Sequence, residues 1–100
     1  MAKVHRQGDA TTGHSCDSNS SAPPTVPASY SPNVFINGKA VVRAGDSIVP
    51  HRCGNSDPHD GVYIGSSSVF VNGKAVQVVG SAISCGDYAA EGSPDVNIGE

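Results

Sequence analysis

The strongest feature of this chain is an internal repeat. Residues 34–41 (VFINGKAV) return almost unchanged 35 positions later as residues 69–76 (VFVNGKAV), and the match continues to Gly45 and Gly80. A repeat of this length within 100 residues predicts one small domain whose units are arranged about a pseudo-symmetry axis. Side chains that meet on that axis are the first candidates for a functional site.

A weaker copy of the repeat lies at the N-terminus. Residues 4–9 (VHRQGD) align with residues 41–46 (VVRAGD) at an offset of 37, and residues 76–81 (VQVVGS) form a third copy without the Arg and the Asp. The missing pair in the third copy argues against strictly threefold packing. The repeat thus predicts three related arms, at about residues 4–14, 34–51 and 69–85.

Each arm is followed by a residue that can bind a metal ion. At the offset of 37, His14 aligns with His51 and Cys16 aligns with Cys53. The third arm reaches Cys85 five positions after its glycine, whereas the first two arms reach a histidine after six. This recurrence is difficult to explain if the repeat serves stability alone.

The composition favours an all-β fold with a thin core. The chain has no Leu and no Trp, and its apolar residues are mainly Val, Ala and Ile, which suit half-buried strands. A small domain of this kind needs further support from disulfides, a metal ion or a partner chain. Since three cysteines cannot all pair within one chain, a disulfide framework is a poor explanation, and a metal or a partner remains.

Charge and hydropathy exclude several classes of function. A net charge of −3, without a basic patch, does not support nucleic-acid binding. The N-terminal residues lack the apolar segment of a secretory signal, and no window is long enough to span a bilayer. We therefore expect a protein made in the cytoplasm without a signal peptide, which leaves the cell only if another machine carries it.

The clearest local signals are two β-hairpins. Residues 34–42 and 69–79 each place apolar runs on both sides of an Asn-Gly pair, which supplies the positive φ angles of a type I′ turn. Residues 4–6 and 62–64 are predicted to form shorter strands.

Two segments lack such signals. Residues 17–33 are rich in Ser, Pro, Ala and Thr and predict an irregular loop. Tyr30 stands in that loop where the second repeat has Gly65. Residues 87–100 are polar, with few apolar anchors, and predict a tail that is part of the domain 1–86 or only loosely held.

The candidate metal ligands are the four histidines and three cysteines. The repeat selects His14, His51 and Cys85, because equivalent positions on related arms converge on the axis. His59 is best placed to supply the fourth ligand, from the short loop after the second arm. Three imidazole nitrogens and one thiolate would close a tetrahedral zinc site of the structural kind, with no open position for water.

Other interpretations of these residues remain open. The pairs His14-x-Cys16 and His51-x-Cys53 form a rival set, since residues i and i+2 of an extended chain point the same way. A further alternative is no physiological metal at all. Taken alone, Cys16 and Cys53 are more simply explained as small buried residues. His5 aligns with ordinary strand positions and is not counted as a ligand.

Asp9 and Asp46 follow the repeat glycines and have two interpretations. They could form a pair of catalytic carboxylates, but a Gly-Asp at the end of a strand is more often a turn that hydrogen-bonds its own backbone. The third arm has Ser81 at that position, which favours the turn. No Gly-x-Ser-x-Gly or His-Glu-x-x-His motif is present, so the sequence gives no catalytic residues and does not predict an enzyme.

Taken together, these motifs resemble the PAAR-repeat family. The resemblance rests on the Val-Phe-Val-Asn-Gly-Lys-Ala-Val hairpin, the Val-x-Arg-x-Gly-Asp arm, Gly13-His14, residues 58–66 (PHDGVYIGS) and Ser84-Cys85-Gly86, and it covers about residues 4–86. The Pro-Ala-Ala-Arg stretch that names the family is degenerate, and only Arg43 survives at the corresponding positions 40–43.

The resemblance implies a small conical domain of short β elements that caps the trimeric β-helical spike of a contractile injection machine, one chain per trimer. In this family one zinc ion near the apex is bound by three His and one Cys, which here would be His14, His51, His59 and Cys85, with iron as the alternative ion. The implied role is structural: to sharpen a phage tail or type VI secretion spike and help it pierce the target envelope. Contact with the target membrane would be brief, and no nucleic acid or small-molecule substrate is implied. Residues 87–100 are too few for a toxin domain, so no effector activity is expected.

Two other functions remain as alternatives. One is a small zinc-dependent hydrolase with an open coordination position and Asp9 or Asp46 as the base. The other is an adhesive β module without a metal. The sequence does not distinguish a phage tail from a secretion spike.

Overall fold

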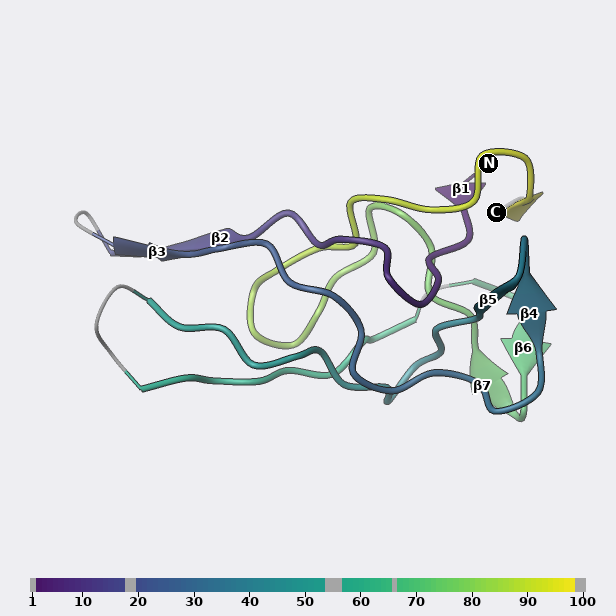
Figure 1. The fold of residues 1–100 in the computed structure, drawn as a ribbon, viewed down its shortest axis with the longest axis horizontal. Coiled ribbons are helices and arrows are strands. Elements are labelled where there is room, and N and C mark those ends of the chain that lie inside the picture. The colour runs from purple at the N-terminus through teal and green to yellow at the C-terminus, as the bar shows by residue number, and fades with distance from the viewer. Residues whose placement is uncertain (1, 18–19, 54–56, 66, 99–100) are drawn as a thin grey trace.

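The computed structural model describes residues 2–17, 20–53, 57–65 and 67–98. Within these ranges it is a compact all-β molecule, 37 × 25 × 20 Å, built from antiparallel two-stranded sheets (Figure 1). The strands are β1 (Ala2–Lys3), β2 (His14–Asp17), β3 (Ser20–Ala22), β4 (Phe35–Ile36), β5 (Lys39–Ala40), β6 (Phe70–Val71), β7 (Lys74–Ala75) and β8 (Asn97–Ile98). No helix in this part of the chain has the length and hydrophobicity needed to cross a membrane.

The two predicted hairpins are confirmed. Strand β4 pairs with β5 and β6 pairs with β7 in the same register, with Phe35 opposite Ala40 and Phe70 opposite Ala75. Asn37 has a φ of 56°. It is followed by a glycine at 77°, and the second hairpin repeats these angles closely. The left-handed conformation at both turn positions is what a type I′ turn requires.

A third strand pair has the same form but is assembled from distant parts of the chain. Strand β8 pairs with β1, with Ala2 opposite Ile98. Residues 93–96 (SPDV) match residues 31–34 (SPNV), and in both the serine Oγ accepts a hydrogen bond from the amide of the valine three residues later. Ser93 is fully buried, so of the two alternatives for the C-terminal residues, residues 87–98 follow the first and are part of the domain rather than a loosely held tail.

The three arms are joined in a closed ring of backbone hydrogen bonds. The amide of His5 donates to the carbonyl of Gln77 at 3.0 Å, Gln77 donates to Val42 at 2.9 Å, and Val42 donates to His5 at 3.2 Å. His5, Val42 and Gln77 occupy equivalent positions in the three copies of the repeat. The alignment of the sequence with itself therefore corresponds to a physical contact between all three arms.

Two apolar clusters of buried residues form the interior. The residues of the first are Val4, Val41, Val76, Val78 and Ile98. The residues of the second are Val42, Ile48, Tyr63 and Ile83. Both clusters are small, as the composition predicts, and every member comes from an arm or from a segment that closes onto one.

Three predicted elements differ from the structure. Residues 4–6 and 62–64 are not continuous strands; Val4, Arg6, Val62 and Tyr63 form isolated antiparallel bridges instead. Neither segment extends as a strand, because its successive bridges go to different parts of the chain: Val62 pairs with Ser47, whereas Tyr63 pairs with Ile83. The irregular loop predicted at 17–33 contains β3, which pairs with β2.

The Gly-Asp sequences of the first two arms form turns, as predicted. The Arg6 amide donates to Asp9 Oδ2 at 2.8 Å, and the Arg43 amide donates to Asp46 Oδ2 at 2.8 Å. In both arms the arginine side chain also forms a buried ion pair with the same carboxylate, at 2.8 Å. The guanidinium then reaches the turn of a hairpin, since Arg43 Nη1 donates to Asn72 Oδ1 at 3.0 Å.

Candidate metal centre

Four side chains that can bind a metal ion gather at one point. The imidazoles of His14, His51 and His59 and the thiol of Cys85 place one ligand atom each within 4.8 Å of the others. His14 Nε2 lies 3.2 Å from His51 Nε2 and 3.1 Å from His59 Nε2. Cys85 Sγ lies 3.9 Å from His51 Nε2. This group could hold a metal ion.

The spacing can be compared with the edges of a zinc tetrahedron. Zn–N bonds of about 2.0–2.1 Å separate two nitrogens by about 3.3–3.4 Å, and a Zn–S bond of about 2.3 Å separates sulfur from nitrogen by about 3.5–3.6 Å. The separations between the imidazole nitrogens are slightly shorter than these edges, and the sulfur-to-nitrogen distance is slightly longer. All four ligand atoms lie within 4.8 Å of one another, so closing around one zinc ion would shorten a separation near that limit by about 1 Å.

Hydrogen bonds at the outer ring nitrogens orient two of the imidazoles. His51 Nδ1 lies 2.7 Å from the carbonyl oxygen of Pro23, and His14 Nδ1 lies 3.2 Å from that of Ser15. A carbonyl only accepts, so Nδ1 carries the proton in both rings and Nε2 keeps its lone pair. Partners of this kind fix the tautomer and the ring orientation of a metal-binding histidine.

The backbone places the remaining two ligands. His51 and His59 face each other in an antiparallel bridge, with reciprocal amide-to-carbonyl bonds of 3.0 and 2.8 Å. Cys85 approaches because Gly61 has no side chain: a Cβ at that position would lie only 3.1 Å from both Cβ and Sγ of Cys85. Local pairing thus sets two histidines, and a glycine makes room for the thiol.

The electrostatics around His59 and Asp87 suit a bound cation. Burial, together with the nearby His51 and His14, holds the pKa of His59 below its ordinary value. Burial alone would raise the pKa of Asp87, but hydrogen bonds from Thr11, Thr12 and the Tyr88 amide outweigh it and lower this pKa. Asp87 is thus a buried carboxylate whose negative charge acts on His51 and His59.

The remaining two cysteines do not belong to this group. Cys16 and Cys53 form a disulfide with a Cα–Cα distance of 6.1 Å. Cys16 is exposed and Cys53 is half-buried, so the interpretation of both as small buried residues is wrong. The rival ligand set is not assembled, since disulfide sulfurs are not thiolates. The expectation that disulfides contribute little is therefore wrong, since two of the three cysteines pair and Cys85 stays free.

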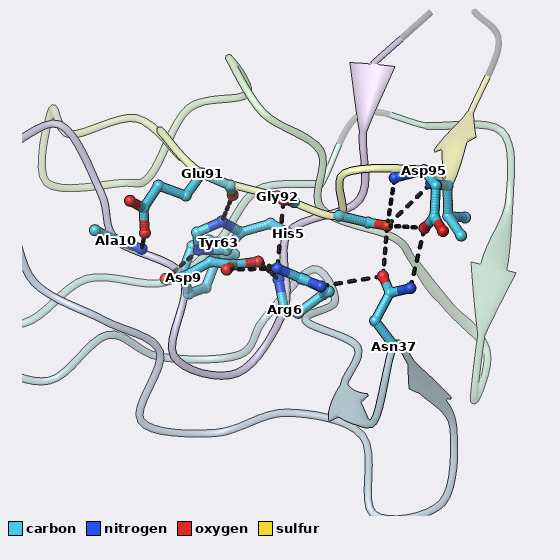
Figure 2. A network of polar contacts seen from close by, with 11 residues as sticks. His5, Arg6, Asp9, Ala10, Asn37, Tyr63, Glu91, Gly92 and Asp95 are labelled. Atoms are coloured by element: carbon cyan, nitrogen blue, oxygen red, sulfur yellow. Dashed lines mark hydrogen bonds and ion pairs between the residues drawn. The ribbon is translucent and has the colours of Figure 1, made fainter.

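His5 lies away from the metal group, in a buried polar network. Its Nδ1 is 2.7 Å from the carbonyl oxygen of Glu91, and its Nε2 is 3.1 Å from the hydroxyl of Tyr63 (Figure 2). Figure 2 also shows the neighbouring ion pair of Arg6 with Asp9. His5 therefore acts inside the ring of arms rather than in the metal centre.

Sequence reasoning did not identify the surroundings of the group. Pro23 orients His51, and Asp87 supplies a buried negative charge, yet both lie in segments predicted to be irregular or loosely held. The repeat carried no signal for them because neither has an equivalent in the other arms.

Searches of known family models and of curated proteins find no match for this chain.

Proposed function

We propose that this chain is a spike tip similar to PAAR-repeat proteins. In this role it forms a small cone with the His14, His51, His59 and Cys85 centre near its apex. It caps the trimeric β-helical spike of a phage tail or type VI secretion system and helps it pierce the target envelope. The chain would be made in the cytoplasm, assembled into the baseplate or secretion spike, and delivered outside the cell with it.

The closed ring of three arms carries this proposal. A trimeric β-helix ends in three equivalent strand edges and an exposed core, which would aggregate if they were left uncovered. A cap made of three related arms can match all three edges with one chain. The hydrogen bonds that link His5, Gln77 and Val42 in a cycle give this chain such an arrangement, despite the different turn in the third arm.

Exposed aromatic side chains mark the surface that would meet the spike. Hairpins β4–β5 and β6–β7 and the pair β1–β8 lie at one end of the long axis, and we call this end the base (Figure 1). Phe35 is 57% exposed and Phe70 is 63% exposed, on equivalent strands of the two hairpins. Large apolar side chains that remain this exposed favour an interface.

The metal centre supports a mechanical role. A domain with two small apolar clusters gains much of its local order from a bound ion, because the free energy of metal binding is also free energy of folding. Three imidazoles and one thiolate fill a tetrahedral zinc site, with iron as the alternative ion. We propose that one structural zinc ion stiffens the end of the molecule that meets the target first.

The same ligand set favours a structural site over a zinc hydrolase. A hydrolytic zinc ion keeps one position for water, whereas four protein ligands leave none. The carboxylates of Asp9 and Asp46, which were the candidate bases, are held by buried arginines. No observation specifically favours the hydrolase, so we propose no enzymatic activity.

Native mass spectrometry tests the proposed partner. The chain is mixed in separate experiments with a phage central spike trimer and a type VI spike trimer encoded in the same genome. We expect one of the two to form a complex of one tip chain per trimer. Binding by neither trimer would contradict the proposal.

Matched variants locate the interface in that experiment. Phe35→Asp and Phe70→Asp place charge on the base and should abolish the complex. Val49→Asp also replaces an exposed apolar residue (41% exposed) but lies in the segment just before His51, and it should leave the complex intact. Equal loss with all three variants would show that binding does not use the base.

A further inference from the structure

We propose that the Cys16–Cys53 disulfide is a reducible cross-link that controls how tightly the metal centre keeps its ion. The disulfide joins equivalent positions just after the first two arms, 37 residues apart. Each cysteine follows a candidate metal ligand by two residues: Cys16 follows His14 and Cys53 follows His51. The cross-link therefore fixes the two segments that carry two of the four ligands. This inference depends on the metal centre and is independent of the spike partner.

The strand that carries His14 is anchored just before its first residue, where the Thr12 amide donates to the Tyr88 carbonyl at 2.9 Å. Strand β2 pairs with β3, and this two-stranded sheet pairs with no further strand in the described residues. Figure 1 shows β2–β3 extending away from the base, toward the same end of the molecule as the segment that leads to Cys53. Ala22, the partner of His14 in this sheet, is buried, but neither apolar cluster includes a residue of β2 or β3.

Apart from the close approach of the His14 and His51 imidazoles, the segment that carries His51 is bonded to the chain that follows β3. His51 Nδ1 contacts the Pro23 carbonyl at 2.7 Å, and the Val49 amide donates to the Val26 carbonyl at 2.8 Å. These bonds hold the chain that follows β3, not the strand that contains His14. The disulfide acts on β2 itself, just beyond His14. Without it, the position of His14 relative to His51 would depend on the β2–β3 hairpin and on the hydrogen bonds of Thr12 to Tyr88 and Asp87.

The disulfide is open to attack by a reductant. Cys16 is exposed and Cys53 is half-buried, so a thiolate from solvent can reach the Cys16 sulfur. A dithiol reductant forms a mixed disulfide with Cys16 and releases Cys53 as a thiolate, which takes up a proton. The second thiol of the reductant then displaces Cys16. Both protein thiols end reduced, and the reductant ends as its cyclic disulfide.

Zinc release to a chromogenic chelator measures the effect. Zinc-loaded protein is prepared oxidised and, in parallel, reduced with a phosphine. Thiol counting after denaturation should give one free thiol in the oxidised form and three in the reduced form, and circular dichroism should show that both remain folded. We expect the reduced form to hold zinc about 10-fold to 100-fold less tightly, the range seen when groups that position metal ligands are removed.

The Cys16→Ser/Cys53→Ser double variant is the matched control. It keeps all four metal ligands but cannot form the cross-link. It should release zinc as readily as the reduced parent, and at the same rate with or without the phosphine. If the parent that has not been treated with the phosphine showed three free thiols, no disulfide would be present and the proposal would be overturned. So would equal zinc retention by the oxidised parent and the double variant.

Discussion

The hydroxyl group of Tyr63 lies 3.1 Å from Nε2 of His5, and both side chains are fully buried. His5 Nδ1 must carry the proton, because it faces the carbonyl oxygen of Glu91 at 2.7 Å. Nε2 therefore accepts the hydrogen bond that Tyr63 donates (Figure 2). Burial lowers the pKa of His5, and burial, followed by the charges of Asp87 and Asp46, raises that of Tyr63. The contact thus joins two neutral groups in the centre of the ring of arms.

The buried His5 predicts a loss of stability in mild acid. Its pKa is lower in the folded protein than in the unfolded chain, where the pKa of histidine is about 6.5. Below that pH the unfolded state binds the proton and the folded state does not, so stability falls as pH decreases. We expect the melting temperature, measured in EDTA, to decrease more between pH 7 and pH 5 in the parent than in His5→Gln. Gln77 shows that a Gln is accepted at an equivalent position. Equal decreases in the two proteins would show that His5 does not contribute.

The ion pair of Arg43 with Asp46 predicts a non-additive double variant. Removing one partner of a buried ion pair costs about 3–5 kcal/mol, because the other charge is left unpaired. Asp46→Ser should therefore lower the free energy of unfolding by about that amount. Arg43→Val/Asp46→Ser copies the third arm, which has Val78 and Ser81 at these positions, and should cost less than Asp46→Ser alone. Chemical denaturation of the single and double variants measures the coupling. This account would be contradicted if the double variant lost as much free energy of unfolding as the two single variants lose together.

Two glycines with similar backbone angles predict different costs on substitution. Gly65 has a φ of 66° and Gly73 a φ of 78°, so alanine is strained at both, by about 1–2 kcal/mol. A Cβ at Gly73 would meet nothing within 4 Å, whereas at Gly65 it would lie 2.8 Å from both Ala44 Cβ and the Ala75 carbonyl oxygen. We expect Gly65→Ala to lower the free energy of unfolding by about 1–3 kcal/mol more than Gly73→Ala, as an overpacked side chain does. Similar losses would mean that backbone angle alone decides the effect.

The sequence predicted the parts of the fold that depend on local chemistry or on the repeat. The Asn-Gly pairs define both hairpins because few other residues adopt positive φ angles at low cost. The repeat predicted that His14, His51 and Cys85 lie close together, and the position of His59 in the short loop after the second arm predicted that it joins them. The structure places all four side chains in one group. The assignment of these four residues as metal ligands stays a prediction.

The parts that were missed depend on contacts between distant segments. The match of residues 93–96 with residues 31–34 was a signal for the third strand pair, but its strands come from opposite ends of the sequence. The disulfide also had a signal, since Cys16 and Cys53 share the offset of 37 that aligns His14 with His51. If the histidines converge, the cysteines two residues later do so too. Composition alone gave no reason to expect this pairing.

Metal content tests the central claim most directly. Elemental mass spectrometry is applied to the untagged parent, to Cys85→Ser and to the Cys16→Ser/Cys53→Ser double variant. The account predicts one zinc ion per chain in the parent and in the double variant, since even a weakened structural site binds tightly. It predicts none in Cys85→Ser, which loses the thiolate ligand. A parent without metal would contradict the account. So would a metal ion that is lost in the double variant and kept in Cys85→Ser.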